Sequence, residues 1–186
     1  MSNVLKRMTS FNPALGVVTM VPNSLGPGEL ITLYGTEQQK DKYLPILADG
    51  TYIPCFGLTG PRNGSDATGE IDTGKVVLDE NNKLHIEVTV NKRYITLAPV
   101  ANLIGLAINL EDPYELLDKD KSGITVAPVE KGSCGLVQET YHNPLNVEFS
   151  NGTLKGNLLI PIENVIGGQE NVGKGWKMLV WQLVED

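Results

Sequence analysis

Residues 54–66 read Pro-Cys-Phe-Gly-Leu-Thr-Gly-Pro-Arg-Asn-Gly-Ser-Asp, a short apolar strand that breaks into a polar loop. Phe56 and Leu58 follow the alternating pattern of a strand, and the glycines, proline and asparagine that follow are typical of turns. Glycine lets the backbone approach a ligand closely, and successive N–H groups form a concave site for phosphate, carbonyl or flavin acceptors. The alternative interpretation of these residues alone is an ordinary surface turn.

A second stretch, residues 91–98, reads Asn-Lys-Arg-Tyr-Ile-Thr-Leu-Ala and ends an expected strand in which Leu84, Ile86, Val88 and Val90 alternate with more polar residues. Together the two stretches resemble the acyl-CoA dehydrogenases. The family has an aromatic-x-x-Thr-Glu-Pro-x-x-Gly-Ser-Asp loop, which this chain matches at Phe56, Thr59, Pro61, Gly64, Ser65 and Asp66. About thirty residues later the family has a Lys-x-(Trp/Tyr)-Ile-(Thr/Ser) strand, matched here at Lys92, Tyr94, Ile95 and Thr96.

The loop also departs from the family pattern. Gly60 replaces the usual Glu, and Arg62 and Asn63 replace small residues. These changes alter the outer face of the loop. Arg62 is either a contact for a CoA phosphate or, as composition favours, an exposed and solvated arginine.

The composition excludes several classes of protein. The 186 residues are 41% hydrophobic and 20% charged, with no apolar run long enough for a transmembrane helix. A net charge of −7 argues against nucleic acid, because binding to phosphates needs clustered Lys and Arg. Cys55 and Cys134 are too few for a disulfide framework, so both are expected reduced in a cytoplasmic protein. His85 and His142 lack partner residues, and no metal is expected.

The expected elements change from helical to alternating after Gly50. Residues 14–21 are apolar without a decisive period, and the family resemblance favours a helix there. A helix over residues 25–34 ends at Gly35, and Thr36 with Gln39 forms a capping-box signature for a helix that Pro45 should kink or end. Nine strands are expected, at residues 53–59, 72–78, 84–90, 94–98, 103–110, 123–129, 136–140, 147–154 and 156–161. The predicted fold class is α+β, with a central antiparallel β-barrel or sandwich domain flanked by partial helical segments.

The resemblance implies three segments. Residues 1–51 correspond to the C-terminal part of the family's N-terminal helical domain, residues 52–162 to its middle β domain, and residues 163–186 to a linker and the first helix of the C-terminal helical domain. That last helix carries apolar residues at helical spacing from Trp176 to Val184 and reaches Asp186 without a capping residue,. The chain is therefore expected to be part of a longer protein.

The resemblance further implies an oxidoreductase of lipid metabolism, closest to the large bacterial fatty-acid β-oxidation members. The full-length protein would use FAD to introduce a trans-2 double bond into fatty acyl-CoA. Its electron acceptor would be an electron-transfer flavoprotein or a similar protein, and it would form a homo-oligomer in the cytoplasm, with membrane association of the full-length protein left open. The implied flavin contacts are Phe56, Leu58, Thr59, Tyr94, Ile95 and Thr96, and Ser65 would contact the CoA moiety of the substrate. Asp66 would brace the loop.

No catalytic residue is assigned, because the usual carboxylate base of the family lies beyond Asp186. Glu185 and Asp186 are declined as bases, since a charged pair at a chain end is usually solvated. The 186-residue chain alone is expected to retain FAD weakly or not at all and to be inactive. The alternatives are an acyl-CoA oxidase or flavin monooxygenase of the same architecture, and a non-enzymatic β-barrel binding module. The sequence leaves the acyl chain length, the electron acceptor and the oligomeric state open.

Overall fold

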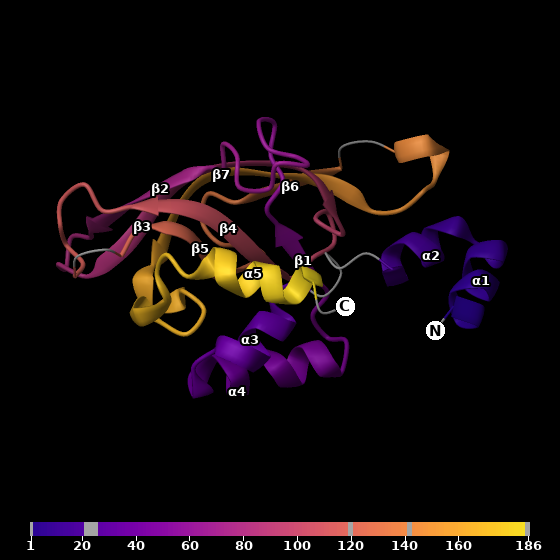
Figure 1. Cartoon of the computed structure of the whole chain (residues 1–186), viewed down its shortest axis with the longest axis horizontal. Helices are drawn as coiled ribbons and strands as arrows, with labels where there is room; N and C mark the ends of the chain where they lie inside the picture. The colour runs from indigo at the N-terminus through magenta and orange to yellow at the C-terminus, as the bar shows by residue number, and fades with distance from the viewer. Residues whose placement is uncertain (1, 21–25, 119–120, 141–142, 185–186) are drawn as a thin grey trace.

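The structure is a computed structural model that describes residues 2–20, 26–118, 121–140 and 143–184. It is a mixed α+β fold, as the sequence predicted (Figure 1). The helices are α1 (Ser2–Phe11), α2 (Pro13–Met20), α3 (Gly28–Tyr34), α4 (Glu37–Ala48) and α5 (Gly175–Val184), with short 3-10 helices at Pro144–Asn146, Ile162–Asn164 and Gln169–Asn171. The strands are β1 (Pro54–Gly57), β2 (Thr73–Leu78), β3 (Leu84–Thr96), β4 (Leu103–Glu111), β5 (Gly123–Glu130), β6 (Val137–Thr140) and β7 (Asn151–Pro161).

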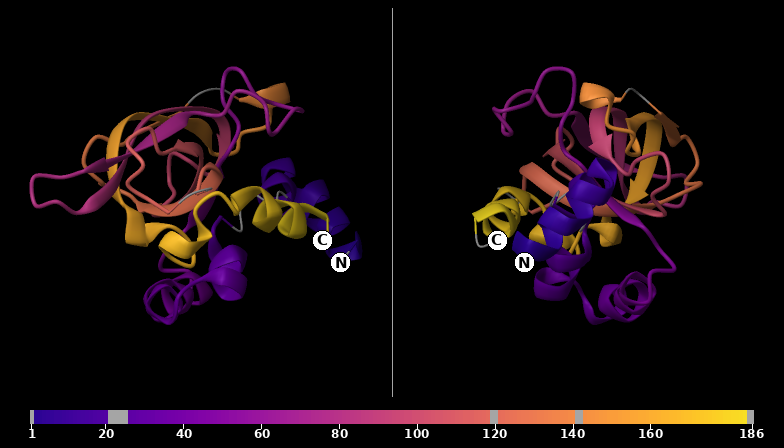
Figure 2. Two further views of the ribbon diagram at one scale, coloured as in Figure 1. Left: turned by 60° about the vertical axis from the view of Figure 1, so that its left-hand side comes forward. Right: turned by 90° about the vertical axis from the view of Figure 1, so that its right-hand side faces the viewer.

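The seven described strands form one open, curved sheet rather than the expected closed barrel or sandwich (Figure 2). Its order is β1-β4-β2-β3-β7-β6, and β5 pairs with β4. Strands β1 and β2 occupy successive parts of one edge of β4, and both run parallel to it. The prediction of an antiparallel domain is therefore wrong at these two pairings. Parallel pairing is possible there because long connections, rather than tight hairpins, separate these strands in the chain.

Two pairs of expected strands are single strands in the structure. Strand β3 continues through residues 91–93 because a β-bulge between Lys92 and Ile95 keeps it paired with β7. Tyr94, within this bulge, adopts a positive φ of 59°. Strand β7 continues through Gly156, which has a φ of 131°. The hydrophobic pattern located the strands. The local sequence indicated a break at residues 91–93, but the bulge accommodates these residues and the strand remains paired with β7,.

The helices follow the predictions, except that α3 begins only at Gly28 and α4 does not end at Pro45. Thr36 and Gln39 form both bonds of the predicted capping box at the start of α4. Gly35 follows the last residue of α3, and residues 13–20 form a helix. Helix α4, however, continues past Pro45 to Ala48. The Pro45 carbonyl accepts a hydrogen bond from the Asp49 N–H, so the last turn closes beyond the proline.

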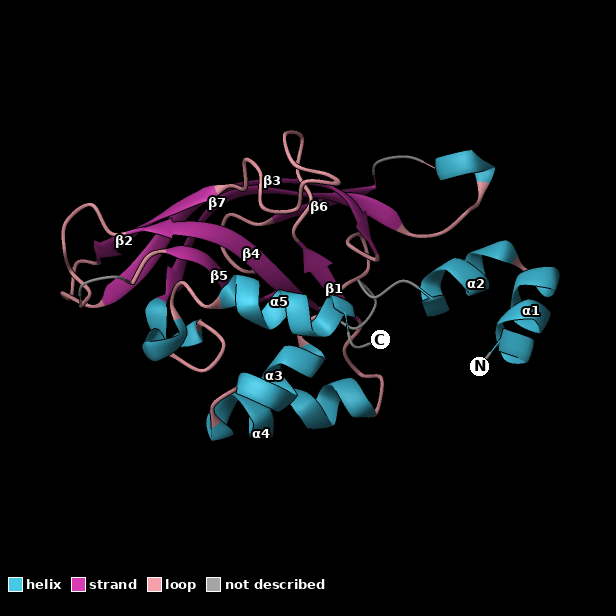
Figure 3. Ribbon diagram, in the orientation of Figure 1, coloured by secondary structure: helices cyan, strands magenta, loops and turns pink. Residues whose placement is uncertain are grey.

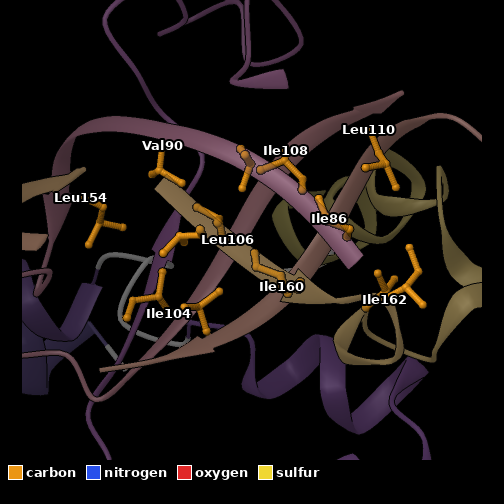
Figure 4. Packing of buried hydrophobic residues seen from close by; sticks show 14 of the residues in the cluster. Ile86, Val90, Ile104, Leu106, Ile108, Leu110, Leu154, Ile160 and Ile162 are labelled. Carbon is orange, nitrogen blue, oxygen red and sulfur yellow. The ribbon is translucent and has the colours of Figure 1, made fainter. Parts of the chain in front are cut away.

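The core has two parts, one on each face of β4. Within the curve of the sheet lies a large cluster, shown in Figure 4, to which Ile86, Val90, Ile104, Leu106, Ile108 and Leu154 belong. A second cluster joins the other face to α3, α4 and α5, which lie together beside the sheet (Figure 3). Residues of β4 alternate between the two, because successive side chains of a strand point to opposite faces. None of the described helices has the length and apolar character needed to cross a membrane.

Candidate functional site

The loop after β1 lies against the end of β3, so the structure brings the two matched stretches together. The Arg93 N–H donates to the Thr59 carbonyl at 3.1 Å, and the Arg93 guanidinium donates to the Pro61 carbonyl at 3.3 Å. The Lys92 ammonium donates to the Leu58 carbonyl at 3.1 Å. The loop is therefore fixed to β3 at three of its carbonyl groups, those of Leu58, Thr59 and Pro61.

Lys92 holds this arrangement from within the core. Its side chain is 0% exposed, and its Nζ lies 3.2 Å from Asp72 Oδ2. The same Asp72 oxygen accepts the Asn91 N–H at 2.9 Å. Burial lowers the pKa of Lys92 because the interior disfavours the ammonium, while the Asp72 carboxylate opposes that shift,. The lysine links β2, β3 and the loop through one charged group.

Sequence reasoning matched Lys92 to the family motif but gave it no role. A signal was nevertheless present. In the first part of β3 the buried residues alternate at Ile86, Val88 and Val90, and Lys92 is the next position in the same phase. A lysine in an inward position of an alternating strand needs a buried partner, since an isolated charge is costly to bury.

The two unusual residues Gly60 and Asn63 depend on each other. Asn63 is buried, and its side-chain amide donates to the Leu58 carbonyl at 3.2 Å, while the Gly60 N–H donates to the Asn63 carbonyl at 3.3 Å. A Cβ at position 60 would lie 2.9 Å from Asn63 Oδ1 and 3.1 Å from the Asn91 carbonyl oxygen. The glutamate that the family has at position 60 would therefore not fit without movement of the loop. The loop keeps its place on β3 with different packing.

The apolar residues proposed as flavin contacts differ in exposure. Phe56 belongs to the second core cluster, where its ring would be 2.7 Å from a Cβ added at Gly105. Ile95 is fully buried in the first cluster. Leu58 is half-buried beside the second cluster. The side chains of Phe56 and Ile95 therefore belong to the core.

The polar and aromatic candidates come from the loop after β1 and from the end of β3. Thr59 is half-buried, Thr96 is buried, and Tyr94 is 44% exposed. The Arg93 guanidinium carbon lies 5.1 Å from the centre of the Tyr94 ring, which is within the range of a cation–π contact,. The positive φ of Tyr94 turns this residue out of the regular strand. The bulge thus places an aromatic ring and a threonine hydroxyl at one end of β3.

The outer part of the loop is exposed. Ser65 lies at its surface. Asp66 accepts the Thr68 hydroxyl at Oδ1 and the Gly69 N–H at its carbonyl, so it braces the loop as predicted. Arg62 is exposed and pairs with Glu70 at 2.7 Å. Cys55 is buried and Cys134 exposed, and no disulfide joins them. His142, Glu185 and Asp186 lie outside the described residues.

Three buried side-chain atoms near the bulge have no hydrogen-bond partner within the described parts of the chain. They are Arg93 Nε, Asn151 Oδ1 and Thr153 Oγ1. Most buried polar groups in proteins are paired, so each such atom calls for an explanation. A flavin needs an apolar support for its ring and polar groups for its heteroatoms, and this end of the sheet supplies both. The residues present fit such a group.

Comparisons with known proteins agree with this architecture. Residues 2–51 match the family model of the acyl-CoA dehydrogenase N-terminal domain. The chain is 30% identical over 165 residues to an acyl-CoA dehydrogenase of Bacillus subtilis, covering 88% of this chain and 41% of that protein. It is 32% identical over 172 residues to a short-chain specific acyl-CoA dehydrogenase of Clostridium acetobutylicum, covering 90% of this chain and 41% of that protein.

The fold is also similar to solved structures. A crystal structure of acyl-CoA dehydrogenase complexed with FAD from Bacillus anthracis superposes with a TM-score of 0.76 at 25% identity, covering 97% of this chain and 28% of that one. The chain is thus similar to acyl-CoA dehydrogenases over most of its own length. The chain spans 41% of the length of each of these two relatives.

Proposed function

We propose that this chain is the flavin- and acyl-CoA-binding middle portion of an FAD-dependent acyl-CoA dehydrogenase. The whole enzyme introduces a trans-2 double bond into fatty acyl-CoA. The observation that carries the proposal is the fixed contact between the loop at Leu58 to Pro61 and the end of β3 at Lys92 and Arg93. Two stretches that match the family in sequence, far apart in the chain, meet at one end of the sheet.

Each residue has a proposed role. Thr59 and Thr96 offer hydroxyl groups to the cofactor, and Tyr94 and Leu58 offer apolar surface beside the ring. Phe56 and Ile95 support the site from the core and contribute backbone groups. When bound, the flavin supplies a hydride acceptor. Ser65, exposed at the outer loop, contacts the CoA moiety of the substrate. We assign no catalytic base among the described residues.

The setting of the whole enzyme is part of the same proposal. Its three segments are residues 1–51, residues 52–162 and residues 163–186, and the match of residues 2–51 to the family's N-terminal domain supports the first boundary. The enzyme works in cytoplasmic fatty-acid β-oxidation, forms a homo-oligomer and passes electrons to an electron-transfer flavoprotein or similar acceptor. The FAD complex of the Bacillus anthracis protein supports the choice of cofactor.

The test uses both the full-length protein and this chain. The full-length protein should purify with flavin absorbance and reduce a dye when acyl-CoA is added. In a flavin fluorescence titration, Thr96→Val should weaken FAD binding roughly three- to tenfold, the effect of one lost hydrogen bond of about 0.5–1.5 kcal/mol. The matched control is Thr73→Val, an exposed position at the start of β2. Full-length protein that is colourless and cannot be reconstituted with FAD would overturn the proposal.

A further inference from the structure

The pairing of β7 with β3 places two further polar side chains beside the candidate site. Asn151 lies directly opposite Thr96. Thr153 lies between Gly152, which pairs with Ile95, and Leu154, which pairs with Lys92, so it faces the bulge at Arg93 and Tyr94. Ile95, Lys92 and Leu154 point into the core. Because side chains alternate along a strand, Asn151 and Thr153 point to the opposite face, the one that carries Thr96.

These two residues are buried without being satisfied. Asn151 and Thr153 are each 3% exposed. Asn151 Oδ1, Thr153 Oγ1 and the neighbouring Arg93 Nε lack hydrogen-bond partners in the part of the chain that the structure describes. A leucine or valine at such positions would fill the space without an unpaired polar atom. Buried polar atoms left unpaired on one face destabilise the free protein, and proteins accept such a cost mainly where function needs the group.

We infer that Asn151 and Thr153 of β7, together with Arg93, are additional cofactor-contacting side chains that hydrogen-bond the polar edge of the flavin. The inference rests on the proposed function. Arg93 Nε is a donor, Asn151 Oδ1 is an acceptor and the Thr153 hydroxyl is both. The pyrimidine ring of a flavin presents two carbonyl oxygens on either side of one N–H, so it needs two donors and one acceptor. The three unpaired atoms supply that set.

The first test compares stability and binding in the same variant. Thr153→Val removes the unpaired hydroxyl of that residue at nearly constant volume. The melting temperature of the cofactor-free chain should rise or stay the same, while the dissociation constant for FAD should rise several-fold. A residue that merely supports the fold would show the reverse: a lower melting temperature and unchanged FAD binding, which would overturn the inference. Thr73→Val, at an exposed position of β2, serves as the control and should change neither quantity.

The second test separates this inference from the proposed function and does not depend on the variants. FAD is titrated into the isotope-labelled full-length protein, and NMR shifts are followed at backbone amides and at the side-chain N–H groups of Asn151 and Arg93. Shifts at Thr59 and Thr96 together with shifts at Asn151 and Thr153 support both the proposed function and this inference. Shifts confined to Thr59 and Thr96 overturn the inference and leave the proposed function intact. The absence of shifts at all four positions overturns both.

Discussion

Two lysine–carboxylate pairs tie distant segments of this protein together, in opposite surroundings. Lys92 and Asp72 lie 3.2 Å apart, with side chains 0% and 10% exposed. Lys42 of α4 and Glu130 at the end of β5 lie closer, at 2.6 Å, with side chains 58% and 36% exposed. The pKa of Lys92 is lowered, chiefly by burial, whereas the pKa of Lys42 is raised, chiefly by its hydrogen bond to Glu130. The shorter pair is not the one on which the fold depends more.

The comparison shows that burial, rather than the distance between the two charges, decides how much an ion pair contributes to stability. Water screens the Lys42–Glu130 pair, and such exposed pairs stabilise a protein little. Glu130 also accepts hydrogen bonds from the hydroxyls of Tyr43 and Tyr52, so the loss of Lys42 would leave it partners. Asp72 and the Leu58 carbonyl also keep one neutral donor each, the Asn91 N–H and the Asn63 amide. If Lys92 is removed, however, the Asp72 carboxylate loses its charged partner inside the protein.

The largest expected effect is therefore that of Lys92→Met. Removing one member of a buried ion pair should lower the free energy of unfolding by about 3–5 kcal/mol, measured by urea denaturation. The matched control is Lys155→Met on β7, an exposed lysine 3.6 Å from Glu139. That variant should change stability by less than about 0.5 kcal/mol. Equal effects of the two substitutions would contradict the distinction drawn between buried and exposed pairs.

Asp72→Asn sharpens the comparison through pH. The folded pKa of Lys92 is already below its ordinary value of 10.5. Between the folded pKa and 10.5 the unfolded chain binds more protons than the folded one, so stability rises with pH in that window,. Loss of the Asp72 charge should lower the folded pKa further and widen the window. Urea denaturation at pH 7 and pH 9 should show a larger gain in the variant than in the parent. An equal gain in both proteins would show that Asp72 does not hold the charge on Lys92.

Glu130→Gln addresses the exposed pair and should have a smaller effect. At pH 7 we expect a loss of less than about 1 kcal/mol, because water screens the pair. The hydrogen bond from Lys42 lowers the pKa of Glu130 below 4.5. A carboxyl with a lowered folded pKa contributes stability above its unfolded pKa and loses it as pH falls through the folded pKa. Thermal denaturation of parent and variant should therefore converge below pH 4.5. A difference in stability between parent and variant that persists in acid would mean that the substitution acts through packing rather than through the charge of Glu130.

The smallest expected effect is that of Arg62→Gln. Arg62 and Glu70 pair at 2.7 Å, but their side chains are 69% and 70% exposed. The variant should unfold at the same urea concentration as the parent within error. A measurable loss would mean that the outer loop depends on this pair more than its exposure indicates.

Local patterns predicted most of the elements. The capping box at Thr36 and the alternation in β3 depend on residues close together in the chain, so the sequence states them directly. The same local view divided β3 and β7 into shorter strands, because a bulge and a strand glycine interrupt the alternation. It also predicted that Pro45 kinks or ends α4, whereas the helix continues to Ala48. These errors arise where pairing or packing with distant segments outweighs the local preference.

By itself the sequence determined the α+β class, the approximate strand positions and the family motifs at residues 56–66 and 92–96. The tertiary structure decided which distant residues contact those motifs. The burial of Lys92 against Asp72, the packing of Gly60 on Asn91 and the position of Asn151 opposite Thr96 all join segments far apart in the chain. Hydrophobic periodicity tells which face of a strand is buried, but it does not say which strand lies beside it. That choice depends on the register of the sheet, which forms only when the chain folds.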